Sequence, residues 1–450
     1  MQPSRAKNVP NLWRNLKRKF PAATISLLDA VVQQAHGQGP SIYLVGGSVR
    51  DLLLNRPNLD LDLVLEGDAI RLGHALVKKF GGHLVSHKAF ATAVWWLPQD
   101  QAKLFRALRV PVKGKHRVRL PDFIDLIASR RETYQHPAAL PRVQFAGIRE
   151  DLYRRDFTIN TMAIRLDGSA KGQLLDPWGG LQDLRGRKLR TLHPLSFSDD
   201  PTRILRILRL ASRLGFNVET GTRRQLKTYL PFLKKVSGKR IRTELELALL
   251  ESMRVSVLRS MQRLGVLKTI HPRLRISSAA EKTLAALHQK LASSSWVSED
   301  FSVSDIGFVL WFMHFLATDV AAISDRLSFR AGLRDAILSA VHLNSLRTKL
   351  PSLRPSRAVA VLEKVPDLAI YAFYLVNRGN KIGKVLKTFV TKWRVVRPKT
   401  DGNRLKKLGL KPGPGYKRIL EQLRSAWLDG EVRTSQQEDA LLKKLLHEQR

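Results

Sequence analysis

The stretch that most constrains the fold is residues 43–64, which read YLVGGSVRDLLLNRPNLDLDLV. An apolar run is followed by a Gly-Gly-Ser turn, a helix-like segment, and a second apolar run that contains Asp60 and Asp62. This order predicts a strand, a glycine turn, a helix and a second strand. Because alternate residues of a strand point to the same face, the two carboxylates are predicted to lie side by side.

Two neighbouring carboxylates repel each other unless a cation lies between them. Oxygen ligands favour Mg²⁺, which proteins hold with a carboxylate pair and substrate phosphates. The glycines let backbone N–H groups approach an anion at the start of a helix. Separately, such a turn or such a strand is ordinary, but the combination favours a metal-dependent site for nucleotidyl transfer.

The chain is strongly basic. It has 450 residues and a formal net charge of +40, from 78 Lys and Arg against 38 Asp and Glu. This excess indicates a polyanionic partner, with nucleic acid favoured over an anionic membrane surface. The absence of cysteine excludes disulfides and thiolate chemistry. The most apolar segment, 307–317, is too short to span a bilayer, so the sequence predicts a cytoplasmic protein without membrane contact.

The hydrophobic pattern changes near residue 194. Before it, short apolar runs alternate with a helical pattern at 68–80, which predicts a mixed α/β region. The predicted strands are 42–45, 61–65, 93–97, 123–127 and 161–166. From 194 to the end the pattern is helical, so the fold class is α+β with an all-α second part.

Two segments are rich in basic residues. Residues 103–119 carry seven Lys or Arg and no acid, and residues 377–407 carry eleven against one acid, Asp401. Since so few acids lie nearby in the sequence, RNA contact is favoured over a solvated surface paired within the chain.

The segment 154–160, RRDFTIN, is the second candidate for the site. Two adjacent arginines beside a metal pair suit a triphosphate, because guanidinium groups bind phosphate oxygens and stabilise the charge of leaving pyrophosphate. The alternative is a salt bridge to Asp156.

Residues 198–203, SDDPTR, begin a predicted helix. Asp200 and Arg203 are three residues apart, which places them on one helical face. A carboxylate beside a guanidinium could pair with the edges of cytosine and adenine and reject uracil and guanine. An ordinary ion pair at a helix start explains the same residues, and the residues alone leave both interpretations open. Arg206, Arg209 and Arg213 continue a basic stripe that could face RNA.

Two further motifs are interpreted as structural. Residues 176–184, DPWGGLQDL, indicate a tight connection, and residues 238–245, GKRIRTEL, begin a helix that supports the preceding one.

With these motifs in this order, the chain resembles the class of CCA-adding tRNA nucleotidyltransferases and poly(A) polymerases found in bacteria and eukaryotes. The resemblance covers roughly 40–435 and includes the ending LGLKPGPGYKRILEQL. It implies a polymerase β-like catalytic head followed by a helical neck, body and tail. The expected parts are a basic arm (1–21), head (22–193), neck (194–272), body (273–360) and basic tail (361–450).

The resemblance also implies roles for single residues. Asp60 and Asp62 would be catalytic and would hold two Mg²⁺ ions. The nucleotide would be bound by Gly46, Gly47, Ser48, Arg50, Arg155, Asp156, Asn160, Asp199, Asp200, Arg203 and Arg206. Asp199 stands where the family usually has Glu, which shortens the side chain and keeps its charge. The expected partners are tRNA, with CTP and ATP as substrates; the oligomeric state is left open.

Three departures from the family pattern stand out. Residues 98–120 look like a basic insertion, predicted as an extended hairpin that touches RNA. Ala91 stands where Gly is usual, and residues 402–405 read GNRL where Asp-Leu is usual, which puts one tail contact in doubt. Whether Asp125 is a third acid of the site remains open.

Several functions share these motifs. The expected activity is template-independent addition of all or part of the 3′-terminal CCA to tRNA. A poly(A) polymerase, or an enzyme that adds only CC or only A, has the same head and neck motifs. A non-catalytic RNA-binding protein fits the charge but not the acidic pair.

Overall fold

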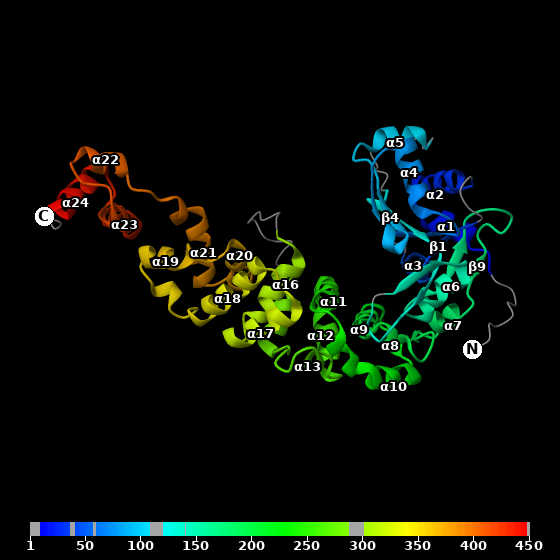
Figure 1. The fold of residues 1–450 in the computed structure, drawn as a ribbon. Helices are drawn as coiled ribbons and strands as arrows, with labels where there is room; N and C mark the ends of the chain where they lie inside the picture. The colour runs from blue at the N-terminus through cyan, green and yellow to red at the C-terminus, as the bar shows by residue number, and fades with distance from the viewer. Residues whose placement is uncertain are drawn as a thin grey trace. The chain divides into compact units, whose positions relative to one another are not determined.

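The computed structural model describes residues 10–36, 41–56, 60–108, 120–139, 141–287 and 301–447. The chain divides into two compact units, Met1–Val236 and Ser237–Arg450 (Figure 1). The predicted neck, 194–272, therefore contains the boundary between the units.

The first unit is built around a seven-stranded sheet with the order β3-β4-β5-β2-β1-β8-β9. β2 and β5 are parallel, and the other neighbouring pairs are antiparallel. The strands of this sheet are β1 Ile42–Val45, β2 Leu61–Leu65, β3 His83–His87, β4 Thr92–Trp96, β5 Phe123–Ala128, β8 Ala163–Arg165 and β9 Leu174–Leu175. Two small ladders pair β6 Arg130–Thr133 with β7 Arg142–Phe145, and β10 Lys188–Leu189 with β11 Asn217–Val218. The mixed sheet confirms the predicted α+β class.

The two faces of the sheet differ because each strand alternates. In β5, Ile124, Leu126 and Ala128 are buried, whereas the residues between them are partly exposed. Helix α4, Ala69–Phe80, packs on β3, β4 and β5 with Leu72 and Leu76 fully buried. The other face carries Asp62 and Asp125, and it is the face on which chemistry is possible.

The helices of the first unit are mostly short. They are α1 Trp13–Lys19, α2 Ala22–Ala35, α3 Gly47–Leu53, α4, α5 Gln101–Ala107, α6 Ile148–Tyr153, α7 Gly180–Arg185, α8 Ser196–Asp199, α9 Arg203–Leu214 and α10 Thr220–Tyr229, with 3-10 turns η1 Lys88–Phe90, η2 Thr158–Asn160 and η3 Leu230–Lys235. The connection at 176–184 is structural, as predicted: the Asp176 carboxylate accepts the N–H groups of Gly180 and Leu181 at 2.6 and 2.9 Å.

Two predictions about basic segments differ from the structure. The described part of the expected arm 1–21 is not an arm: it forms α1, and Leu12, Leu16 and Phe20 are buried. The apolar spacing of these three residues gives the helix a face to bury, despite its basic residues. The described start of the insertion 98–120 forms the helix α5 with Leu104 buried, instead of a hairpin; residues 109–119 lie outside the described residues.

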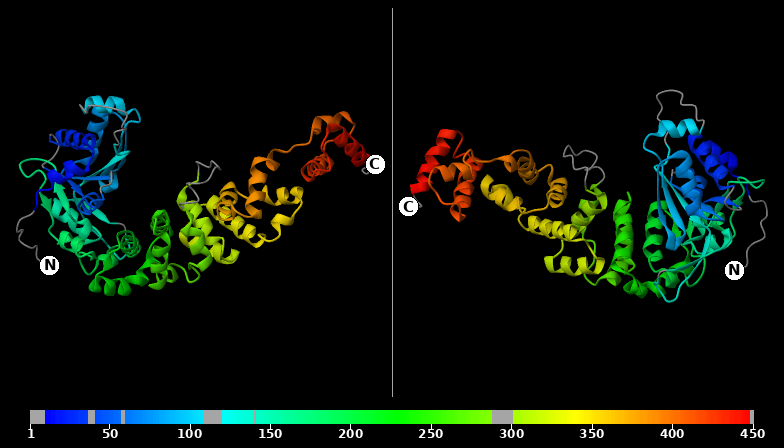
Figure 2. Two further views of the ribbon diagram at one scale, coloured as in Figure 1. Left: turned by 180° about the vertical axis from the view of Figure 1, so that it is seen from behind. Right: turned by 45° about the horizontal axis from the view of Figure 1, so that its top comes forward.

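The second unit consists of helices and short turns throughout its described residues (Figure 2). They are α11 Gly238–Leu250, α12 Arg254–Arg263, α13 Val266–Ile270, α14 Ser278–Ala285, α16 Val303–Phe312, α17 Ala317–Leu327, α18 Ala331–Ser345, η4 Leu350–Ser352, α19 Pro355–Leu362, α20 Asp367–Asn377, α21 Lys381–Thr391, η5 Trp393–Val395, α22 Gly402–Lys407, α23 Pro414–Asp429 and α24 Ser435–His447.

The apolar segment near 307–317 is a core helix. In α16, Phe308, Trp311 and Phe312 are fully buried, and the rings of Phe308 and Phe312 contact Phe329 at interplanar angles of 60° and 77°. No helix among the described residues is long and apolar enough to cross a membrane.

Candidate active site

The predicted carboxylate pair lies on the open face of the sheet. Asp60 directly precedes β2, and Asp62 within β2 is in register with Asp125 of the parallel strand β5. Burial, together with the negative charges of Asp125 and Asp60, raises the pKa of Asp62 to about 6, although Arg155 and Arg50 oppose this shift. Burial and the charge of Asp60 also raise the pKa of Asp125. Three carboxylates therefore lie close together, and burial disfavours the charged forms of Asp62 and Asp125.

The glycine turn lies directly against this cluster. Gly46 precedes α3 with φ of +70°, a conformation that L side chains rarely adopt. A Cβ atom at Gly46 would lie 2.9 Å from Nη1 of Arg155 and 3.5 Å from Oδ2 of Asp62. Ser48 fixes the approach of the two segments, since its hydroxyl donates to the carbonyl oxygen of Asp60. The turn, the acid pair and the arginine motif thus meet at one point, where a side chain would block the space.

Arg154 and Arg155 are held by a buried acid that the sequence interpretation missed. Asp151, one turn earlier in α6, has a fully buried side chain and accepts from Arg154 at 2.7 Å and from Arg155 at 3.0 Å. Burial alone raises the pKa of Asp151, but the two guanidinium groups outweigh it and hold this pKa below its usual range. The suggested salt bridge to Asp156 is wrong, because Asp151 takes both arginines. Arg155 keeps its Nη1 edge toward the glycine turn.

The remaining predicted residues of the head form a second network. Arg50 donates to both carboxylate oxygens of Asp51, at 2.7 and 2.8 Å, and to Oδ1 of Asn160 at 2.7 Å. The Asn160 amide in turn donates to Asp156 at 2.9 Å. The buried Asp156 also pairs with Arg206 at 2.9 Å. Burial opposes ionisation of Asp156, yet Arg206, Asn160 and Arg203 hold its pKa below the usual range.

The candidate base-reading residues are arranged differently from the prediction. The helix α9 begins at Arg203, so Asp200 is not on its face; Asp200 precedes it with extended backbone and accepts from the Thr202 N–H at 3.0 Å. This follows from Pro201, since a residue before proline avoids helical backbone. Arg203 is buried and donates to the Ser196 hydroxyl at 2.7 Å and the Arg154 carbonyl at 2.6 Å. The pair is thereby tied to the arginine motif.

Asp199 ends α8 beside this pair and lies 3.8 Å from His193. Burial raises the pKa of Asp199, and the charge of Arg203 opposes the shift.

Part of the predicted basic stripe on α9 faces acids of the first unit, whereas the sequence predicted that it faces RNA. Arg206 pairs with Asp156 at 2.9 Å, and Arg213 lies 3.8 Å from Asp51. These acids come from segments about fifty and a hundred and sixty positions away, which the local pattern does not show. The two arginines therefore hold α9 to the carboxylates that position Arg50 and Asn160.

The acidic residues of the site fit a divalent cation whose remaining ligands come from the substrate. Within the described residues no group of three or more His, Asp or Glu side chains forms a ready-made metal site. Burial, with the nearby charges of Asp125 and Asp60, nevertheless raises the pKa of Asp62 and so disfavours its bare charged form. A pair of carboxylates with open positions suits Mg²⁺, which takes its other ligands from water and phosphate.

Within the described residues, the basic run 377–407 contains arginines that pair with acids and lysines that do not. Arg394 pairs with Asp367 and Arg404 with Asp439, at 2.8 and 2.7 Å. The prediction that the cations of this run lack acidic partners within the chain is therefore wrong for both arginines. Lys381, Lys384 and Lys387, by contrast, are exposed along one face of α21 and have no acidic partner among the described residues.

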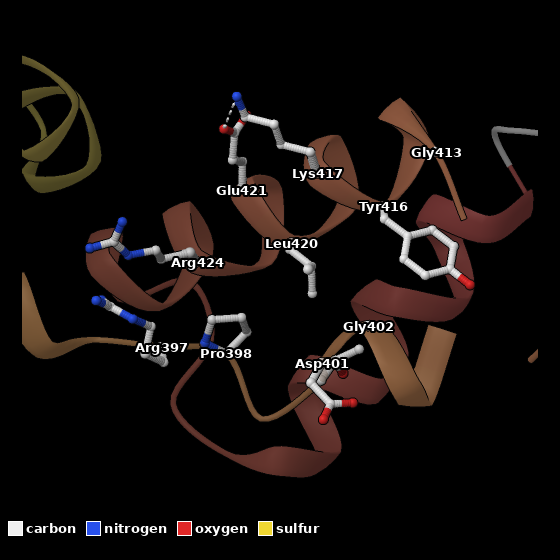
Figure 3. Close-up of a pocket in the computed structure, with 11 residues that line it drawn as sticks. Arg397, Pro398, Asp401, Gly402, Gly413, Tyr416, Lys417, Leu420, Glu421 and Arg424 are labelled. Atoms are coloured by element: carbon white, nitrogen blue, oxygen red, sulfur yellow. Dashed lines mark ion pairs between the residues drawn. The ribbon is translucent and has the colours of Figure 1, made fainter. Parts of the chain in front are cut away.

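The end of this run and helix α23 line a pocket of about 650 Å³ (Figure 3). Figure 3 shows Tyr416 and Leu420 of α23 over one side and Asp401 and Gly402 over another. Its cation Arg424 is held by Glu363 at 2.6 Å, and Lys417 lies 3.9 Å from Glu421. Arg397 also lines the pocket and donates to the carbonyl oxygens of Arg394 and Val396, so the positive charge of the pocket is only partly paired with acids.

Some supporting acids could have been found from spacing. Asp151 stands three and four residues before Arg154 and Arg155, the spacing of neighbours on a helix. Glu132, which accepts from Arg154 at 2.9 Å, lies on the hairpin strand β6 and has no local signal.

Comparison with known proteins agrees with this geometry. Residues 42–190 match the poly A polymerase head domain, and residues 215–276 match a probable RNA and SrmB-binding site of polymerase A. Among solved structures, a Thermotoga maritima CCA-adding enzyme complexed with tRNA is 27% identical, with a TM-score of 0.67, and covers 99% of this chain and 100% of its own. A CCA-adding enzyme complexed with ATP is 28% identical, with a TM-score of 0.73 over 99% of this chain and 100% of its own.

Two relatives match almost the whole chain. An A-adding tRNA nucleotidyltransferase of Geobacter sulfurreducens is 31% identical over 97% of this chain, which spans only 48% of that relative's length. A second, from Halalkalibacterium halodurans, is 31% identical over 93% of this chain and 91% of its own length. On this shared length, motif order and site geometry, the chain belongs to the tRNA nucleotidyltransferase family.

Proposed function

We propose that this protein transfers nucleotides from ATP or CTP to the 3′ end of tRNA without a nucleic-acid template, adding all or part of the terminal CCA. The observation that carries the proposal is the meeting of Asp62, Gly46 and Arg155 within a few ångströms on the open face of the sheet. An acid pair, an anion-binding turn and a guanidinium at one point are the parts that nucleotidyl transfer needs.

The chain's own residues divide the work. Asp60 and Asp62 would hold two Mg²⁺ ions, which would supply positive charge for the attacking 3′-hydroxyl and the leaving pyrophosphate. The N–H groups at the start of α3 and the free edge of Arg155 hold triphosphate oxygens beside them. Asp151 fixes Arg155 with a charge-assisted pair at 3.0 Å, so the guanidinium is in place before the substrate arrives. Arg50 donates a hydrogen bond of 2.7 Å to Asn160, and the two side chains form one wall of the proposed nucleotide site.

The base is read, in this proposal, by Asp200 and Arg203, with Asp199 beside them. Arg203 is anchored through the Arg154 carbonyl, so base and triphosphate are positioned by one connected network. Arg203→Ala is expected to reduce the preference for CTP and ATP over UTP and GTP by about 5- to 150-fold, the range of a lost bidentate base contact. Unchanged nucleotide choice in a folded variant contradicts this role.

Relatives favour one of the partial activities. Two relatives that are 31% identical over 93–97% of this chain are A-adding enzymes, whereas a CCA-adding enzyme of Limosilactobacillus reuteri is 28% identical over 89% of it. We therefore place addition of the terminal A first and addition of the full CCA second. A tRNA substrate would be met in the cytoplasm, as the sequence also predicts.

The test uses three tRNAs that end at the discriminator base, at C, or at CC, each with ATP or CTP alone or together. Extension of the CC-ending tRNA by a single A, with no extension of the other two, is the result expected of an A-adding enzyme. Growth of all three to CCA identifies a full CCA-adding enzyme. Long A tracts on an unstructured RNA, or no incorporation by the intact protein, contradict the proposal.

A further inference from the structure

The open face of the sheet continues beyond the carboxylates as a row of rings. Register pairs Phe123 of β5 with Trp96 of β4, and Trp96 with His83 of β3. Asp60 lies one residue before the pair Leu61–Ile124, so it is level with Phe123 at the start of this row. Paired residues of neighbouring strands point to the same side. The three rings therefore share the face of Asp60.

These rings are packed on one another and open to the outside. The Trp96 and Phe123 ring centroids lie 5.0 Å apart, and the rings of His83 and Trp96 are parallel, 5.8 Å apart. Trp96 keeps 38% of its surface exposed, unlike the neighbouring Trp95 on the other face, which is fully buried. A large aromatic surface that stays exposed next to a reaction centre is a candidate binding surface.

The position of the row relative to the triphosphate identifies its occupant. The glycine turn follows β1, which lies on one side of β2, whereas β5, β4 and β3 extend from the other side. Arg155 lies on the β1 side as well, because its guanidinium lies beside Gly46. Arg203 lies there too, because it donates to the carbonyl oxygen of Arg154. In phosphoryl transfer the attacking oxygen approaches opposite the leaving group. The RNA that carries this oxygen therefore enters over β5 and β4.

We infer that Trp96 and Phe123 form a stacking platform for the 3′-terminal bases of the RNA acceptor. With a strand spacing of about 4.8 Å, Trp96 lies about 10 Å from Asp60, within reach of the last base or the one before it. Stacking on an aromatic face tolerates any base, which suits an acceptor whose end changes with each addition. The inference rests on the proposed function and deepens it by naming residues that hold the acceptor.

The test places 2-aminopurine at the 3′ end of a tRNA and measures its fluorescence on binding, without any nucleotide. Wild-type protein and Trp96→Phe are expected to quench the probe, and Trp96→Ala is expected to lose the quenching while filter binding still detects the tRNA. In steady state, Trp96→Ala should lower kcat/KM for tRNA about 5- to 100-fold and leave the KM for ATP unchanged. Val85→Ala is the matched control, since Val85 is 41% exposed on the same face but outside the row.

Quenching that persists in Trp96→Ala overturns the platform, as does an equal loss in Val85→Ala. These outcomes are distinct from a failure of the proposed function, in which wild-type protein neither binds nor extends tRNA. Extension by wild type with an unquenched probe also overturns the platform and leaves the proposed function standing.

Discussion

Positive charge is used in opposite ways by the active-site arginines of the first unit and by the arginines near the end of the second. In the first, arginines pair with buried acids: Asp151, which holds Arg154 and Arg155, has 0% of its side chain exposed. In the last helices of the second unit the pairs lie in solvent, as with Arg404 and Asp439, whose side chains are 42% and 44% exposed. Earlier in that unit Arg273 still pairs with the buried Asp319. Arginine paired with a buried acid therefore fixes a geometry, whereas arginine paired at the surface supplies a charge that solvent screens.

The lysine face of α21 extends this contrast. Lys381, Lys384 and Lys387 have no acidic partner within the described chain, so their charge is free for a polyanion. We therefore propose that the first unit carries out the chemistry and that the second supplies much of the affinity for RNA.

The largest expected effect separates chemistry from binding. Asp62→Asn should reduce nucleotide incorporation by about a thousand-fold or more, because a ligand for the catalytic metal is lost. Binding of tRNA, measured by filter retention, should stay near the wild-type value. Substantial incorporation by this variant contradicts the role of Asp62.

The same variant should be more stable without metal. The pKa of Asp62 is raised to about 6, so the folded protein holds this proton more tightly than the unfolded chain. Its ionised form then costs stability as pH rises from about 4 through 6, and at pH 7 Asp62→Asn should gain about 1–3 kcal/mol. Urea unfolding in EDTA measures this gain, and a loss of stability contradicts the repulsion.

The next effect compares a buried acid with an exposed one. Asp151→Asn leaves two arginines without their buried partner and should cost about 3–5 kcal/mol. The matched control Asp439→Asn removes an exposed partner and should cost less than about 1 kcal/mol. Equal losses in urea unfolding would remove the contrast between the units.

A smaller effect concerns the lysine face. Changing Lys381, Lys384 and Lys387 together to Ala should weaken tRNA binding about 10- to 100-fold and reduce the slope of log Kd against log salt by about 2–3. The control removes the same charge from paired arginines, Arg354, Arg394 and Arg404, each of which has an acidic partner. If both triple variants lose the same slope, the lysine face has no special role.

The smallest effect is on the metal requirement. Since Asp62 must lose a proton with a pKa of about 6 to bind Mg²⁺, the half-saturating Mg²⁺ concentration should rise about tenfold from pH 7 to pH 5. Activity titrated with Mg²⁺ at each pH measures the shift. A constant requirement means that Asp62 is ionised throughout this range.

Sequence predicts this protein best where the interactions are local. The alternation at Asp60 and Asp62 and the helix at 68–80, found as α4 Ala69–Phe80, depend on neighbours within a few residues. The exposed, polar strand β3 His83–His87 was missed because it lies at the edge of the sheet without an apolar run. The partners of Arg206 and Arg394 were missed because Asp156 and Asp367 reach them only through the fold.

The most direct test of the division of labour is to vary salt while measuring two quantities for one tRNA: its Kd, and the single-turnover rate of incorporation at saturating tRNA. We expect log Kd to rise steeply with log salt, with a slope of about 0.7–0.9 for each phosphate contact, while the saturated rate changes little. A saturated rate that falls in parallel with the affinity would contradict this division of labour, because the buried pairs of the first unit would then be no better shielded than the exposed charges of the second.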